Sequence, residues 1–162
     1  MFREMRRNKQ LLSAADTIAV LERCTNGILA CHGDDGYPYA VPVSPVYSNG
    51  KIYFHSAKAG HKMDAILNNP KVSFSVIDED TIVSEEYTSY FRSAIAFGRA
   101  RIAEGEERLA SFAALVEKFS GAQPALEKQM KITECDHALM VAIDIEHLTG
   151  KEAIEYVRAK GG

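Results

Sequence analysis

The sequence lacks the features that mark several large classes of protein. No apolar run approaches the length that spans a membrane, and the basic start of the chain is not followed by the apolar stretch of a signal peptide. The net charge is −3 and no long block of lysine and arginine is present, so nothing predicts a nucleic acid as partner. We therefore expect a cytoplasmic protein that binds neither membranes nor nucleic acids.

Patterns for metals, disulfides and dinucleotides are missing as well. Cys24, Cys31 and Cys135 form an odd set without a CxxC pair, which favours a reducing compartment and argues against a disulfide framework. No spacing of cysteine and histidine is typical of zinc, so we predict no metal site. No GxGxxG motif offers a dedicated site for a nicotinamide nucleotide.

The composition that is present fits one ordinary globular domain. The chain has 162 residues, of which 46% are hydrophobic and 25% charged, and this is enough for one substantial core. We assign residues 1–162 to a single domain, with 1–12 as an N-terminal arm and 150–162 as a polar tail.

Apolar periodicity and turn signals predict a mainly β protein with short helices. Asp35 with Gly36, and Asn49 with Gly50, are typical of hairpin turns because these residues tolerate positive φ angles. Apolar runs predict six antiparallel strands, at residues 28–31, 37–46, 51–56, 71–77, 87–102 and 138–145. Helices are expected at 13–24, 61–68, 104–119 and 124–130, and the acidic residues 78–86 are expected to form a loop. Six such strands joined by hairpins indicate a small barrel.

The expected strand 37–46 contains three of the five prolines in the chain. Pro38, Pro42 and Pro45 cannot donate hydrogen bonds to a neighbouring strand. The strand is therefore either an irregular edge or a strand along which a ligand lies, and the residues alone leave both possibilities open. A closed barrel would keep it from being an open aggregation edge.

Residues 53–62 (Tyr-Phe-His-Ser-Ala-Lys-Ala-Gly-His-Lys) form the strongest candidate binding site. An apolar strand ends in His55 and Ser56, and a turn then leads into a helix that opens with His61 and Lys62. A hydroxyl, the amides of a helix N-terminus and an ammonium group can converge on one anion, so this stretch predicts a phosphate site. The alternative is a surface histidine at a strand end followed by a solvated helix start.

Three segments together resemble the FMN-binding split-barrel superfamily, which includes pyridoxamine 5′-phosphate oxidases, and within it the 5-nitroimidazole resistance (Nim) proteins. They are residues 33–43 (Gly-Asp-Asp-Gly-Tyr-Pro-Tyr-Ala-Val-Pro-Val), 53–62 and 92–99 (Arg-Ser-Ala-Ile-Ala-Phe-Gly-Arg). Their order and spacing match the family, and the resemblance extends from residue 2 to about residue 153. It implies a mainly β fold, a six-stranded antiparallel split barrel with short helices.

The resemblance also implies a homodimer that holds FMN in a cleft between the subunits. The backbone of Val41, Pro42 and Val43 would line the isoalloxazine ring, and this agrees with a proline-bearing strand that has few donors to pair. Ser93 would approach the flavin from the second subunit, although on an alternating strand it could equally face solvent.

The phosphate end of the FMN falls on the candidate binding stretch. By resemblance, His55 and Ser56 would reach the phosphate or the ribityl chain, and His61 and Lys62 would bind the phosphate. His55 or His61 is the candidate proton donor to a reduced substrate, because histidine titrates near neutral pH.

The implied activity is that of an FMN-dependent oxidoreductase which, like Nim proteins, reduces a small planar acceptor such as a nitroimidazole to the amine. Any NAD(P)H would bind transiently over the flavin. The chain has no arginine in residues 39–42 and no Arg-x-His motif, so we do not expect pyridoxamine-phosphate oxidase activity. Two alternatives stay open: a non-catalytic FMN-binding protein, and a haem-binding split barrel with His137 or His147 as axial ligand.

Overall fold

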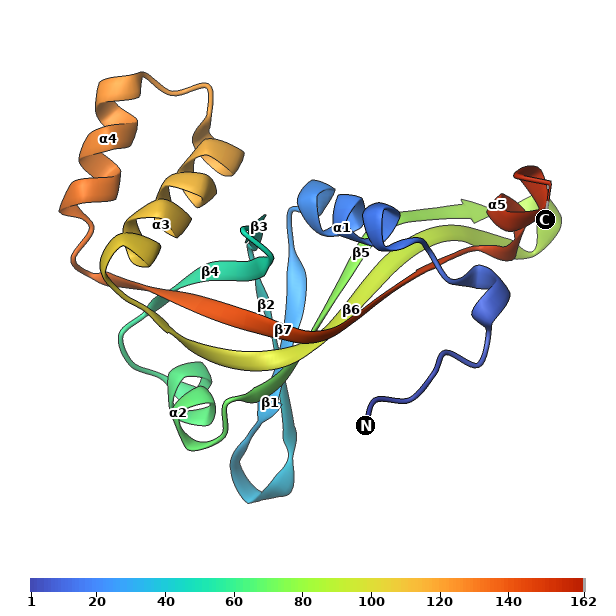
Figure 1. Ribbon diagram of the computed structural model, residues 1–162, viewed down its shortest axis with the longest axis horizontal. Coiled ribbons are helices and arrows are strands. Elements are labelled where there is room, and N and C mark those ends of the chain that lie inside the picture. Colours follow the sequence, from blue (N-terminus) through green and yellow to red (C-terminus); the bar gives the residue numbers. More distant parts are fainter. Residues whose placement is uncertain (162) are drawn as a thin grey trace.

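The structure is a computed structural model that describes residues 1–161. It confirms the mainly β fold, in which seven antiparallel strands form one curled sheet accompanied by short helices (Figure 1). The strands are β1 (Gly27–His32), β2 (Pro38–Val43), β3 (Val46–Ser48), β4 (Lys51–Ala57), β5 (Lys71–Val83), β6 (Thr88–Ala103) and β7 (Ala138–Glu152). Their order across the sheet is β2-β1-β5-β6-β7-β4-β3.

Seven strands replace the expected six because the expected strand 37–46 is divided. The strand breaks at Ser44 and the buried Pro45, and its two parts are β2 and β3. Within residues 1–161, β2 pairs with β1 alone, so it is an edge strand, which is one of the two possibilities that the sequence left open. The expectation that barrel closure protects this edge is wrong, because β2 and β3 end the strand order and no ladder joins them.

Both hairpin turns form where the turn residues predict them. Asp35 and Gly36 have φ angles of 53° and 79°, and they connect β1 to β2. Asn49 and Gly50 have φ angles of 48° and 76°, and they connect β3 to β4. Each pair therefore adopts the left-handed conformation that tight hairpins require.

The acidic residues 78–86 were expected to form a loop, and this expectation is wrong. After a bulge at Asp78, β5 continues to Val83 and stays paired with β6. The partner strand supplies a compensating charge, since Arg92 Nη1 lies 2.7 Å from Glu79 Oε2. Opposite charges on facing strands stabilise such a pairing, so the acidic run is compatible with a strand.

The segment 150–162 was expected to be a polar tail, and most of it is regular structure. It contains the end of β7 and the helix α5 (Ile154–Ala159), while Gly162 lies outside the described residues. The amide of Leu12 donates to the carbonyl of Gly150 at 3.0 Å. The N-terminal arm is therefore attached to the last strand.

The first four helices form where the sequence signals predict them. The helices are α1 (Ala14–Arg23), α2 (His61–Asn68), α3 (Gly105–Ser120), α4 (Ala125–Glu134) and α5, with short 3-10 turns at Asn8–Gln10, Asp34–Gly36 and Ser84–Glu86. The helix α4 extends four residues beyond its expected end, and α5 was not expected. Ser13 caps α1, since its Oγ accepts from the amide of Asp16 at 3.0 Å. A helix with the length and apolarity needed to cross a membrane is not found in residues 1–161.

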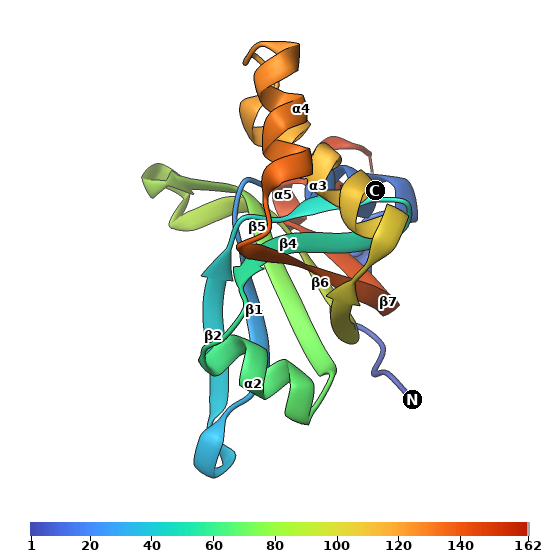
Figure 2. The ribbon, with the colours of Figure 1, turned by 90° about the vertical axis from the view of Figure 1, so that its left-hand side faces the viewer.

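Two clusters of buried side chains divide the fold. The larger one joins the sheet to α1 and α2 and contains Leu21, Phe54 and Phe74. The smaller one lies between β4, β7 and α3 and contains Tyr53 and Leu115. The helices α3 and α4 accordingly lie on one side of β4, and α2 lies on the other (Figures 1 and 2).

Candidate functional site

The first turn of α2 presents free backbone donors. The helix begins at His61, directly after Gly60, whose φ of 122° suits a residue without a Cβ. The carbonyl of Gly60 accepts from the amides of Met63 at 2.9 Å and Asp64 at 3.1 Å, and no side chain caps the helix. The two amides before these, those of His61 and Lys62, have no acceptor within the helix. They can therefore donate to an anion.

Lys62 adds an ammonium group to this helix start. Its side chain is half-buried, and its Nζ lies 5.5 Å from the centre of the Phe54 ring. Among residues 1–161, no carboxylate lies within 4.0 Å of Nζ. Burial lowers the pKa of the Lys62 ammonium, because the charged form loses hydration when it is partly removed from water. A phosphate would supply the missing negative charge, so these residues fit the phosphate of a nucleotide cofactor.

Strand alternation separates His55 from Ser56. Side chains alternate between the two faces of a strand, so Ser56 shares the face of the buried Phe54, toward α2. His55 shares the face of Tyr53, toward α3. Ser56 is 4% exposed and His55 is exposed. The structure therefore groups Ser56 with Lys62, and it places His55 on the other side of β4.

His61 is held against the β1–β2 hairpin. Its ring stacks on Tyr39, with 3.9 Å between ring centres and 27° between ring planes. Its Nε2 lies 3.6 Å from Asp34 Oδ2, a distance longer than a hydrogen bond. His61 thus lies beside the first amides of α2, with the Asp34 carboxylate close to its Nε2.

The β2 edge offers backbone along the predicted ring-binding segment. Val43 is buried and Val41 half-buried, and both pack toward the larger core cluster. Pro42 is exposed and has no N–H group. A flat group could approach this edge without breaking a strand pair.

Ser93 lies on the outer face of the sheet, away from α2. Along β6 it is about 20 Å from Arg99, which pairs with Lys71 shortly after the end of α2. On β1, Ile28 pairs with Pro42 of β2 on one side and with Ser75 of β5 on the other. Ser75 pairs in turn with Ile95 of β6, so Pro42 and Ile95 lie in the same row across the sheet. Ser93 is two positions from Ile95 and shares its face. A single chain therefore does not bring Ser93 to Lys62.

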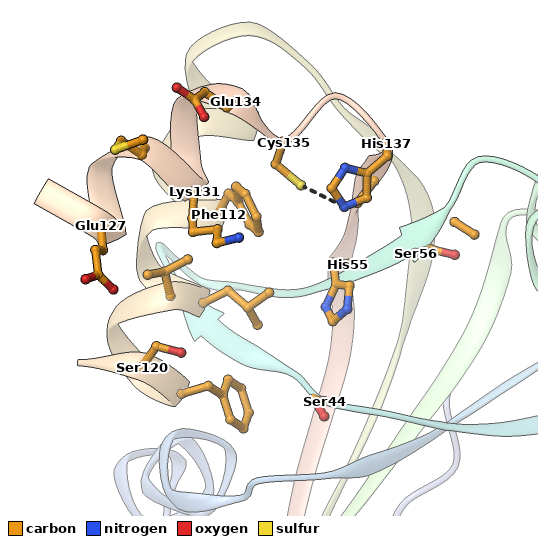
Figure 3. A pocket seen from close by; sticks show the side chains of 16 residues that line it. Ser44, His55, Ser56, Phe112, Ser120, Glu127, Lys131, Glu134, Cys135 and His137 are labelled. Atoms are coloured by element: carbon orange, nitrogen blue, oxygen red, sulfur yellow. Dashed lines mark hydrogen bonds between the residues drawn. The ribbon is translucent and has the colours of Figure 1, made fainter. Parts of the chain in front are cut away.

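A cavity of about 900 Å³ opens on the α3 side of β4 (Figure 3). His55 lines it, together with Lys131 of α4 and the linker residues Cys135 and His137. Ser56 borders the cavity only along the strand, because its hydroxyl points away from these side chains in Figure 3. Cys135 Sγ lies 3.8 Å from His137 Nε2. In residues 1–161, no three His, Cys, Asp or Glu side chains gather as a metal site would require.

The sequence did not indicate this cavity. Lys131 and Cys135 are ordinary helix-end and linker residues, and His137 was placed only among possible haem ligands. Their convergence on His55 depends on how α3 and α4 fold back over β4, which no local pattern encodes. His147, the other possible haem ligand, stacks on Phe2 with 4.7 Å between ring centres.

The family described as pyridoxamine 5′-phosphate oxidase matches residues 13–152 of the chain, which confirms the resemblance inferred from the sequence. No curated protein shows significant sequence similarity. One similar solved structure is a candidate 5-nitroimidazole antibiotic resistance protein from Bacteroides thetaiotaomicron, with 18% identity, a TM-score of 0.72, and coverage of 88% of this chain and 86% of that one. A conserved hypothetical protein from Mycobacterium tuberculosis has 22% identity, a TM-score of 0.79, and coverage of 98% and 94%. An FAD-binding protein from Mesorhizobium loti has 27% identity, a TM-score of 0.66, and coverage of 89% and 97%.

Proposed function

Because the chain belongs to the pyridoxamine 5′-phosphate oxidase family, we propose that it is an FMN-dependent oxidoreductase that reduces small planar acceptors of the nitroaromatic type. The observation that carries this proposal is the half-buried Lys62 ammonium, which lies at the first amides of α2 and has no carboxylate partner among residues 1–161. An FAD-binding protein of the same fold, 27% identical, supports a flavin as cofactor. The fold shared with a candidate 5-nitroimidazole resistance protein supports the class of acceptor.

The residues on the α2 side of β4 would hold the phosphate. Lys62 supplies charge, the first amides of α2 supply directed donors, and the Ser56 hydroxyl faces the same side. The ring would lie along the backbone of residues 41–43. The edge of the His61 imidazole would orient the phosphate, while Tyr39 holds that imidazole in place by stacking on it.

A second copy of the chain would complete the site. Ser93 lies on an outer sheet face that also carries the exposed apolar side chains Ile28, Ile77 and Ile95, which are 39%, 66% and 43% exposed. Contiguous apolar surface of this kind favours association. Pairing of two such faces in a homodimer would bring Ser93 of one chain toward the β2 edge of the other.

A bound flavin supplies two-electron chemistry that no side chain of this protein provides. Reduction of a nitro group to an amine takes up three pairs of electrons with matching protons and releases two molecules of water. The electron pairs would come from a hydride donor such as NAD(P)H. His55 is exposed and lines the cavity, so its imidazole can deliver protons to an acceptor held there.

The decisive assay is anaerobic turnover with FMN, NADH or NADPH, and a nitroimidazole, with the nitro absorbance and the amine product both followed. We expect loss of the nitro group to require FMN, and His55→Gln to slow turnover while FMN affinity stays unchanged. Tight FMN binding without turnover would favour the non-catalytic flavoprotein instead. A Soret band in the purified protein, without flavin, would favour the haem-binding alternative.

Oxidation of pyridoxamine phosphate is not part of the proposal. The chain has no Arg-x-His motif, which that reaction's substrate site is expected to need. We expect no hydrogen peroxide from pyridoxamine phosphate with the FMN-loaded protein, and measurable peroxide production would contradict this.

A further inference from the structure

The helix α4 is held away from the sheet and packs mainly on α3 (Figure 2). Polar contacts fasten it, since Lys128 Nζ lies 2.7 Å from Glu117 Oε2 and 3.0 Å from the carbonyl of Gly121. No residue of α4 is buried, and its Leu126 and Met130 are 73% and 46% exposed. Apolar side chains on a helix that buries none of them need another partner.

The cavity described above separates α4 from β4, and its two ends differ in chemistry. One wall is apolar and comes from the helix pair, with Phe112, Val116, Phe119 and Met130 among its members. The other end is polar, and Figure 3 shows Lys131, Cys135, His137 and His55 around one space. The volume of about 900 Å³ lies within the range of small-molecule sites, which combine an apolar lining with a few convergent polar groups.

The charges at the polar end favour an anion. Lys131 forms no ion pair with any carboxylate in the part of the chain that the structure describes, and the imidazoles of His55 and His137 can donate hydrogen bonds. Glu127 and Glu134 also line the cavity, but Figure 3 places both carboxylates on the side of α4 away from the two histidines. A negative group would therefore sit between Lys131 and the histidines, and an apolar body would lie against α3 and α4.

We infer that this cavity is a binding site for aromatic carboxylates, with the carboxylate at Lys131 and the ring against the apolar wall of α3 and α4. The site is separate from the predicted phosphate site, because α2 lies on the opposite side of β4. The two are nevertheless close along the chain, since Ala57 lines the cavity and His61 begins α2, at most about 14 Å further on.

This assignment deepens the proposed function, and it rests on that function only in making the bound acid the electron acceptor. A nitro-substituted aromatic acid would then be the preferred acceptor, with the α3–α4 pair as the element that selects it. Binding of the acid itself requires no flavin.

The test is calorimetric titration of the flavin-free protein with naphthalene carboxylate and with the matched uncharged naphthalene carboxamide. We expect the carboxylate to bind more tightly. Lys131→Gln should weaken carboxylate binding about threefold to fivefold, the worth of a solvent-exposed ion pair, and leave carboxamide binding unchanged. Lys71→Gln, at an exposed lysine that does not line the cavity, is the control and should change neither affinity.

A second variant tests the apolar wall independently of charge. Val116→Trp fills the cavity, so the affinities for both ligands should fall at least about tenfold, while circular dichroism confirms that the variant is folded. Equal affinities for the two ligands in the wild-type protein, or unchanged binding in Val116→Trp, would overturn the assignment. Competition between FMN and the carboxylate would also overturn it, because the cavity would then belong to the flavin.

Failure of the two proposals can be told apart. Carboxylate binding by a protein that takes up no FMN would leave the cavity assignment standing and refute the proposed function. FMN binding without carboxylate binding would refute the cavity assignment and leave the proposed function standing. Loss of a dimer in Val116→Trp, measured by light scattering, would show that a second chain covers the cavity and would refute the ligand site.

Discussion

Replacement of Lys62 by methionine separates a cofactor-binding lysine from a structural one. The substitution keeps the length and apolar stem of the side chain and removes its charge. In the structure that charge is half-buried, has no carboxylate within 4.0 Å among residues 1–161, and has its pKa lowered by burial. A folded-state pKa below the unfolded value means that the protonated amine destabilises the folded state at neutral pH. This penalty disappears only when the pH rises above both pKa values.

The expected effects of Lys62→Met on stability and on binding have opposite signs. Without FMN, the free energy of unfolding should stay the same or rise by up to about 1 kcal/mol, because a partly desolvated charge is removed. A hydrogen bond to a charged group contributes about 1.5–3 kcal/mol, so the dissociation constant for FMN should rise about tenfold to 150-fold. If Lys62 only supported the fold, its replacement would instead lower the free energy of unfolding and leave the affinity for FMN unchanged.

Two measurements on the same protein test this prediction. Urea unfolding of the flavin-free protein gives the stability, and quenching of flavin fluorescence gives the affinity. Lys58→Met is the matched control, since Lys58 is exposed in the turn before α2, and neither quantity should change by more than the error. A Lys62→Met protein that loses more than about 1 kcal/mol of stability while it binds FMN normally would refute the reasoning.

Three further predictions concern the fold. Gly27→Ala would place a Cβ 2.3 Å from Phe74 Cζ and should cost about 1–3 kcal/mol in urea unfolding; an unchanged midpoint would contradict the packing described. Hydrogen bonding from Arg101 lowers the pKa of Glu107 from 4.5 to about 2. The ionised Glu107 carboxylate therefore stabilises the folded state fully above about pH 4.5, and this contribution is lost as the pH falls toward 2. Glu107→Gln should therefore flatten the acid limb of stability against pH, and an equally steep limb would contradict this. Ser13→Ala removes the cap of α1 and should cost about 1 kcal/mol by thermal unfolding, whereas Ser13→Asp should preserve stability.

Local signals were sufficient where one residue type decides the backbone. The helix 61–68 was predicted at its observed bounds because Gly60 can begin it and the Asn69-Pro70 pair cannot continue it. The two hairpins formed at their Asp-Gly and Asn-Gly pairs for the same reason. In each case the decisive interaction lies within a few residues.

Local signals gave the wrong structure where pairing between distant residues decides the backbone. The acidic residues 78–86 predict a loop, because acidic residues are uncommon in strands. The segment nevertheless forms a strand, since Arg92 on the facing strand compensates the charge of Glu79. The division of the strand 37–46 at Pro45 could not be located, since any of its three prolines could have broken it.

The candidate site was predictable only in part for the same physical reason. The sequence grouped His55 with Ser56, yet alternation along β4 turns them to opposite sides. Ser93 lies far from Lys62 within one chain, so its predicted role depends on an assembly. The cavity brings together two helices and a strand that are about fifty residues apart or more in the sequence, and periodicity carries no information about such contacts.

The most direct test of the central claim is a comparison of FMN, FAD and riboflavin as ligands of the flavin-free protein by fluorescence titration. The phosphate site at α2 predicts that FMN binds at least about tenfold more tightly than riboflavin, because riboflavin offers nothing to Lys62. It also predicts that this difference disappears in Lys62→Met. Tighter binding of FAD than of FMN would correct the identity of the flavin and leave the phosphate site intact. Equal affinities for FMN and riboflavin, or no binding of any flavin, would contradict the account.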